Sequence, residues 1–270
     1  MTESSELRSR LQRKATRVLG RLRRHELPSA VIVPEVPESH YYPQAPTCQV
    51  QDMWFILEFF LGRRERGCFI EVGAHDGYSF SNSWGLAERG WEGFLIEPVP
   101  QLAAAATERH RGHPRITVVT QAVGAEEGVL ELQLAGALTT ANAALAGEYE
   151  HVNGFREHLT GETVTVRQER LDSFLERTKL DGELDLVIVD VEGFEAAVFS
   201  GFDLDHWKPK ILVVEIADVH PDLTTTRSHD AILSQSIQDA GYQIVQKDRI
   251  NTIYVRQDCW ARCYELHVGT

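Results

Sequence analysis

The sequence lacks long apolar runs and the ligand pattern of a structural zinc site. Among its 270 residues, no stretch approaches the roughly 18 consecutive apolar residues of a membrane-spanning helix, and the first residues lack the apolar core of a secretory signal. The four cysteines, Cys48, Cys68, Cys259 and Cys263, do not form the two ligand pairs that structural zinc requires, which favours reduced thiols. We therefore expect a cytoplasmic protein.

Positive charge is scarce outside one short segment. Residues 1–24 hold eight Lys and Arg against two Glu, a net charge of +6. Because the whole chain has a net charge of −13, the remaining residues carry −13 − 6 = −19. The segment also places apolar side chains at helical spacing: Leu7, Leu11, Val18 and Leu22. We expect a basic amphipathic helix over residues 1–26, with residues 7–24 on an anionic membrane surface. The alternatives are a frayed helix, or a helix packed against a second subunit in a homodimer; the acidic remainder argues against nucleic acid.

Five of the ten prolines lie in residues 27–50, which predicts an extended connector without helices. Within it, "HYYPQ" (40–44) could line a site, but we expect its aromatic residues to anchor the connector on the domain surface. The remainder, residues 51–270, is expected to form one folded domain. Its segment 135–161 is rich in Gly, Thr and Asn. This composition is typical of either a lid that covers the molecule bound in a site, here called an acceptor lid, or a disordered loop.

The domain alternates short apolar runs with helical patterns. Five runs predict strands buried on both faces of a parallel sheet: 68–72, 93–97, 115–119, 184–191 and 211–216. The helical patterns fall at 82–89, 101–111, 169–178, 192–200 and 229–240. Segments 129–134 and 163–166 alternate apolar and polar residues, as half-exposed strands do, and 242–255 is typical of an antiparallel hairpin. We predict a doubly wound, mostly parallel α/β sheet with this hairpin at one edge.

Acidic residues end four of the predicted strands: Glu71, Glu97, Asp190 and Glu215. Ligands of such folds bind at the carboxyl ends of the strands, so these positions are candidates for the site. Carboxylates gathered on one rim repel one another unless a cation or hydroxyl donors are present.

The loop after the first predicted strand distinguishes the candidate ligands. It runs Gly73-Ala74-His75-Asp76-Gly77 and contains neither G-x-G-x-x-G nor a G-x-x-x-x-G-K-[ST] loop. An anionic phosphate would meet carboxylates here. S-adenosylmethionine (SAM), which carries a sulfonium, an ammonium and two ribose hydroxyls, would gain from them.

The motifs "FIEVGAHDG", "GFLIEPVP", "ERLDSF", "LVIVDVEGFEAAVFSGF" and "ILVVEI" resemble those of the FkbM family of SAM-dependent methyltransferases, over about residues 51–255. The resemblance implies a class I (Rossmann-like) methyltransferase fold and O-methylation of a sugar, glycolipid, oligosaccharide or polyketide-like natural product. It also implies cofactor contacts at Glu71, Gly73, His75, Gly77, Ser81, Asn82, Glu97, Gln121 and Ala122. The acceptor is expected to meet the methyl group at Asp190, Glu192 and Glu195.

A hydroxyl needs help to lose its proton, and the strand-end acids can supply that help in two ways. Asp190 and Glu215 can act as base and orienter, or they can coordinate Mg²⁺. Asp218 and His220 follow closely enough to assist either version. Two other function classes stay open: a non-catalytic SAM-fold binding module, and an NAD(P)-linked or nucleotide-sugar enzyme on a related sheet.

Overall fold

The computed structural model describes most of the chain from residue 41 onward. The described residues are 41–50, 53–135, 139–142, 145, 161–178, 180, 183–219 and 224–259. The predicted N-terminal helix (1–26), the first part of the connector, most of the predicted lid and His220 lie outside these residues. Within the described part, no helix has both the length and the apolar character needed to cross a membrane.

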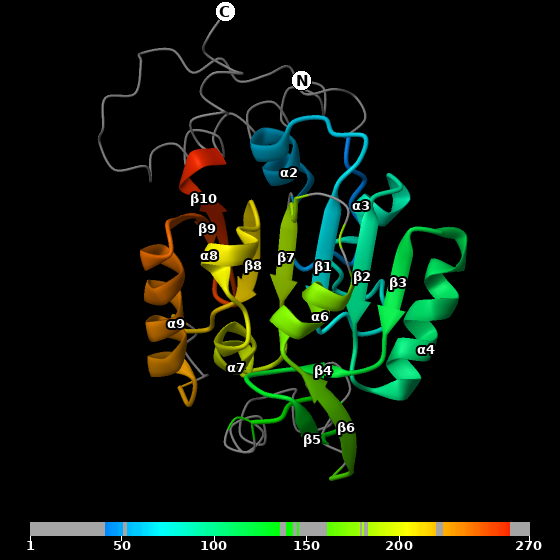
Figure 1. Ribbon diagram of the computed structural model, residues 1–270, viewed down its shortest axis with the longest axis vertical. Coiled ribbons are helices and arrows are strands. Elements are labelled where there is room, and N and C mark those ends of the chain that lie inside the picture. Colours follow the sequence, from blue (N-terminus) through cyan, green and yellow to red (C-terminus); the bar gives the residue numbers. More distant parts are fainter. Residues whose placement is uncertain are drawn as a thin grey trace, which may run out of the picture.

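A seven-stranded sheet forms the centre of the molecule (Figure 1). Its order is β3-β2-β1-β7-β8-β10-β9, with every pair parallel except β8–β10 and β10–β9. The strands are β1 (Cys68–Val72), β2 (Glu92–Ile96), β3 (Ile116–Val119), β7 (Leu186–Val189), β8 (Ile211–Glu215), β9 (Tyr242–Lys247) and β10 (Asn251–Arg256). The predicted parallel sheet with an antiparallel C-terminal hairpin at one edge is confirmed.

Helices cover both faces of this sheet. They are α2 (Met53–Leu61), α3 (Trp84–Glu88), α4 (Pro100–Arg109), α6 (Leu171–Thr178), α7 (Glu195–Ser200), α8 (Leu204–Trp207) and α9 (Arg227–Asp239), with a 3₁₀ turn η1 (His110–Gly112). Buried residues of α2 and α3 share one apolar core with β1 and β8, whereas those of α6, α7 and α9 share a second core on the opposite face. The result is the three-layer arrangement expected for a parallel sheet buried on both faces.

A second, three-stranded sheet lies beyond the carboxyl ends of the central strands (Figure 1). It has the order β4-β6-β5 and consists of β4 (Ala122–Val123), β5 (Gly128–Gln133) and β6 (Thr163–Glu169). The apolar side chains of β5 alternate, and Leu132 is buried in a small core with Val99, Ala122 and Val166. This sheet therefore adds an apolar wall at the edge where the strand-end carboxylates lie.

The described part of the connector is packed into the domain through Tyr42. Its side chain is fully buried and lies edge-on to Trp91, with ring centroids 5.7 Å apart. The hydroxyl donates to the carbonyl oxygen of Gly62 at 2.8 Å and accepts from the N–H of Arg64 at 3.1 Å. The predicted aromatic anchoring is confirmed for this residue.

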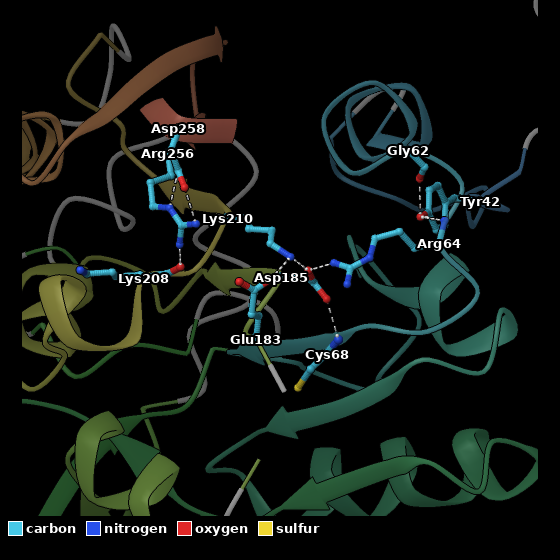
Figure 2. Close-up of polar contacts among 10 residues, drawn as sticks. All are labelled: Tyr42, Gly62, Arg64, Cys68, Glu183, Asp185, Lys208, Lys210, Arg256 and Asp258. Carbon is cyan, nitrogen blue, oxygen red and sulfur yellow. Dashed lines mark hydrogen bonds and ion pairs between the residues drawn. The ribbon is translucent and has the colours of Figure 1, made fainter. Parts of the chain in front are cut away.

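A buried ion-pair cluster joins the amino ends of three strands (Figure 2). The carboxylate of Asp185, which is 1% exposed, accepts from Lys210 Nζ at 2.7 Å, from the Cys68 N–H at 3.1 Å and from the Arg64 guanidinium. Lys210 also pairs with Glu183 at 2.6 Å. Because β7, β8, β1 and the segment after α2 each contribute a group, the cluster fixes how these elements meet at this edge of the sheet.

Candidate functional site at the carboxyl edge of the sheet

A cavity of about 600 Å³, including the space at its open mouth, lies at the carboxyl ends of β1, β2 and β7. Its polar part is lined by Gly73, His75, Glu97, Gln121, Asp190 and Glu192, and its apolar part by Leu102, Ala122, Leu130, Leu132 and Phe194, among others. Thr139 and Ala141, the described residues of the predicted lid that reach the cavity, complete the wall. The structure thus brings seven of the predicted site residues together in one cavity: Gly73, His75, Glu97, Gln121, Ala122, Asp190 and Glu192.

The loop after β1 crosses very close to the end of β7. Gly73 has φ +85°, and a Cβ placed on it would lie 1.7 Å from the carbonyl oxygen of Asp190. Glycine is therefore required here by the neighbouring backbone. His75 has φ +51°, so a non-glycine residue takes the left-handed conformation for which glycine is best suited.

Glu97 holds this loop and faces the cavity. One carboxylate oxygen accepts the N–H of His75 and the other accepts the N–H of Val99, both at 2.9 Å. Burial raises the pKa of Glu97 to about 7, although the two N–H groups act in the opposite direction. Each carboxylate oxygen has two acceptor positions, so the group keeps capacity for further donors from a ligand.

Gln121 lines the cavity and is held in place by a charged pair, Glu169 and Arg177. Its amide donates to Glu169 at 2.8 Å, and Glu169 accepts two hydrogen bonds from Arg177, at 2.6 and 2.9 Å. The next residue, Ala122, begins β4 and lies against Leu132. A flat apolar group of a ligand would therefore contact Ala122 and Leu132, beside a Gln121 amide whose orientation is fixed.

Four predicted cofactor residues lie away from the cavity, where they hold the loop. The Glu71 carboxylate accepts from Ser81 Oγ at 3.0 Å, from Ser83 Oγ at 2.6 Å and from the Asn82 N–H at 3.0 Å. Gly77 has φ +76°, and its carbonyl oxygen lies 2.9 Å from His110 Nε2. Contact of Glu71, Gly77, Ser81 and Asn82 with a ligand stays a prediction.

Three carboxylates meet where β7 and β8 end. One oxygen each from Asp190, Glu192 and Glu215 lie within 4.8 Å of one another. Burial raises the pKa of Asp190; burial and the charges of Glu192 and Asp190 raise the pKa of Glu215 well above its usual range. Asp190 and Glu215 lie close enough that the negative charge of Asp190 opposes the ionisation of Glu215. Two of the four predicted strand-end acids thus come together, and Glu192 joins them.

The other predicted catalytic-side residues have partners of their own. Glu195 accepts the N–H groups of Val191 at 2.9 Å and Gly193 at 3.3 Å, and burial raises its pKa to about 8. Asp218 pairs with Lys247 at 2.6 Å. Glu195 therefore shapes the loop after β7, and Asp218 closes the neighbouring loop after β8.

A family model for the methyltransferase FkbM domain matches residues 71–244, from the last two residues of β1 to the first half of β9. The chain belongs to the FkbM methyltransferase family. Among curated proteins, none matches this sequence. The central sheet, mostly parallel with antiparallel strands at one edge, is the class I methyltransferase fold implied by the resemblance.

Solved structures with a similar arrangement have low sequence identity. An O-methyltransferase from Bacillus cereus in complex with SAH is 14% identical, with 95% of this chain and 93% of that chain covered and a TM-score of 0.42. A putative O-methyltransferase from Klebsiella pneumoniae is 11% identical, with coverage of 92% and 89% and a TM-score of 0.43. Aeropyrum pernix fibrillarin with bound S-adenosyl-L-methionine is 11% identical, with coverage of 70% and 66% and a TM-score of 0.35.

Proposed function

We propose that this family member transfers the methyl group of SAM to a hydroxyl oxygen of a small-molecule or glycan acceptor. The observation that carries the proposal is the use of the N–H groups in the loop after β1. Gly73 and Ala74 donate to the carbonyl oxygen of Ile96, and His75 donates to Glu97. Farther along, Gly77 donates to Ala74, and Tyr78 and Ser79 donate to Asp76. A pyrophosphate would need such N–H groups free, whereas SAM does not.

The cavity has a polar region that suits the ribose of SAM and an apolar region that suits its adenine. Glu97 follows β2 and would accept the two ribose hydroxyls, while Leu102, Leu130 and Leu132 would enclose the adenine. In this orientation the methyl group would point to Asp190 and Glu192. When bound, SAM supplies an electrophilic methyl group on sulfur and leaves as S-adenosylhomocysteine.

The residues of this chain would contribute alignment and proton removal. An in-line displacement depends mainly on holding the acceptor oxygen opposite the sulfur, which is the task of a closed cavity wall. As the oxygen–carbon bond forms and the carbon–sulfur bond breaks, the hydroxyl proton would pass to a carboxylate of Asp190 or Glu215. Mg²⁺ bound at these carboxylates would assist the same step by lowering the pKa of the hydroxyl.

An exposed aromatic residue beside the cavity favours a sugar as the acceptor. Phe80 is 54% exposed, with φ +65°, and its ring centroid lies 6.4 Å from that of His75, which lines the cavity. An exposed ring of this kind can pack against the apolar face of a sugar. The backbone conformation is costly for phenylalanine, which supports a role beyond packing.

Calorimetric titration with SAM, S-adenosylhomocysteine and NADPH tests the proposal without knowledge of the acceptor. SAM and its product should bind and NADPH should not. Glu97→Ala should weaken SAM binding about 10- to 150-fold, the scale of hydrogen bonds lost to a charged group. Glu131→Gln, on an exposed position of β5, is the matched control. NADPH binding without SAM binding would favour the oxidoreductase alternative, and SAM binding without turnover of any hydroxyl acceptor would favour a binding module.

A further inference from the structure

We infer that Asp190, Glu192 and Glu215 form a binding site for a hard divalent cation, Mg²⁺ or Mn²⁺, which is occupied before SAM or acceptor binds. Asp190 follows β7 directly, Glu192 lies in the loop that leads to α7, and Glu215 is the last residue of β8. Their nearest oxygens lie within 4.8 Å of one another. The use of this cation in catalysis depends on the proposed methyl transfer, but its binding does not.

One oxygen of the cluster is buried without a partner. Glu215 is only 9% exposed, and its Oε2 atom has no hydrogen-bond partner in the described part of the chain. Leaving a buried carboxylate oxygen without a donor or a cation is costly. A cation between the three side chains would satisfy this oxygen.

Neighbouring buried carboxylates that end strands or begin helices are all satisfied, which sets Glu215 apart. The satisfied carboxylates, each with at least two donors, are Glu71, Glu97, Glu195 and Asp230. None of the ion pairs found among the described residues involves Asp190 or Glu215. Lys247, the last residue of the edge strand β9, pairs with Asp218 at 2.6 Å. The side chain of Gln49 acts as a donor to Asp190, but it carries no charge. Asp190 and Glu215 are therefore not neutralised by any ion pair in the described part of the chain.

The backbone holds Glu192 in a conformation that brings it to the cluster. Its φ is +54°, and the next residue, Gly193, has φ +85°. Thr140 Oγ1 donates to the Glu192 carbonyl oxygen at 2.6 Å, and Glu195 accepts the Gly193 N–H at 3.3 Å. Strained residues of this kind persist where the surroundings hold them, and they are common at ligand sites.

The donor set indicates the class of cation. Three carboxylates offer oxygen ligands alone, which suit Mg²⁺, Mn²⁺ or Ca²⁺ better than zinc or copper. With bonds of about 2.1 Å, opposite oxygens of an octahedral Mg²⁺ site lie about 4.2 Å apart and adjacent ones about 3.0 Å apart. The three carboxylate oxygens, which lie within 4.8 Å of one another, are near enough for side-chain rotation to bring them into such a site. The open cavity beside Asp190 and Glu192 leaves room for water and for an acceptor hydroxyl as further ligands.

The test uses Mn²⁺ alone with the full chain, followed by electron paramagnetic resonance and calorimetry, and then Mg²⁺ as competitor. We expect one Mn²⁺ per chain, displaced by Mg²⁺, and binding weakened about tenfold or more in Asp190→Asn, Glu192→Gln and Glu215→Gln. Glu131→Gln, an equal change of charge on an exposed residue of β5, should bind as the wild type does. Wild-type affinity in all three cluster variants, or no binding by the wild type at millimolar Mn²⁺, would overturn the site.

Folding and cofactor binding of the variants are measured separately. Each cluster variant removes one of three neighbouring carboxylates that repel one another. Without metal, its melting temperature should therefore equal or exceed that of the wild type. Only the wild type and Glu131→Gln should gain stability from Mn²⁺. A cluster that merely shapes the loop would instead lower the melting temperature when altered, with no change in the Mn²⁺ response. Mn²⁺ binding without SAM binding would refute the methyl-transfer proposal and leave the cation site intact.

Discussion

Replacing Glu71 by glutamine should make the stability of the protein less dependent on pH. Glu71 is 3% exposed and accepts hydrogen bonds from two serine hydroxyls and one backbone N–H. Burial raises the pKa of its carboxyl from 4.5 to about 7, although these hydrogen bonds oppose the shift. Between these two values the folded chain keeps a proton that the unfolded chain has released. Stability is therefore lost as the pH rises through this range.

The size of the effect follows from the two pKa values. Between pH 5 and pH 8 this one group should remove about 2.5 kcal/mol from the free energy of unfolding. Glu71→Gln fits the same site, because its amide oxygen can accept the Asn82 N–H while its amide nitrogen donates to the oxygens of Ser81 and Ser83. The variant should match the wild type near pH 5 and exceed its stability by about 2.5 kcal/mol at pH 8.

Urea unfolding at pH 5 and pH 8, monitored by tryptophan fluorescence, measures this difference. Comparison of the two proteins at each pH cancels the contribution of the other titrating groups. Glu131→Gln, exposed on β5, should show no such divergence. A constant gap between Glu71→Gln and wild type at both pH values would show that Glu71 is already ionised in the fold, and that its hydrogen bonds outweigh burial.

Two further substitutions test the backbone of the site and the opposite edge of the sheet. Lys210→Met should cost about 3–5 kcal/mol of unfolding free energy, because it leaves the buried carboxylate of Asp185 short of a cation. Adding Asp185→Asn should recover most of that loss, and a loss below about 1 kcal/mol in the single variant would contradict the argument. Gly73→Ala should lower both the melting temperature and SAM affinity, since its Cβ would lie 1.7 Å from the Asp190 carbonyl oxygen. Gly112→Ala, which meets nothing within 4 Å, is its control, and equal behaviour of the two variants would show that the loop can shift.

The central sheet could be predicted because its strands are continuous apolar runs that end at polar residues. The observed ends of helices differ from the predicted ends where the conformation of single residues decides them. The helix expected from residue 192 begins at Glu195, because Glu192 and Gly193 take left-handed conformations. The helix at Met53–Leu61 was not predicted, since "MWFILEFFL" has no polar face from which to read a helical period.

The site could be predicted only in part, because a sequence pattern shows which residues stand near strand ends but not where their side chains point. Glu71 and Glu97 both stand near the end of an apolar strand, but Glu71 lies inside β1 and is turned to Ser81 and Ser83, whereas Glu97 lies one residue beyond β2 and faces the cavity. A sequence pattern cannot distinguish these two directions. The alternation in residues 129–134 did indicate the inward face of β5, yet nothing local showed that this face would close the cavity.

The packing of Tyr42 makes the apolar core of this chain extend beyond the segment that the family pattern covers. The family pattern begins at residue 71, yet Tyr42, Val50 and Trp54 share one core with Phe69 and Trp91. A chain shortened to start at residue 71 would lose α2 and most of β1 and would expose part of this core, and exposed apolar surface promotes aggregation. Cleavage by a protease after residue 62 should therefore unfold the domain, because residues on both sides of the cut share one core. A tag fused before residue 41 would leave the packing of Tyr42 intact.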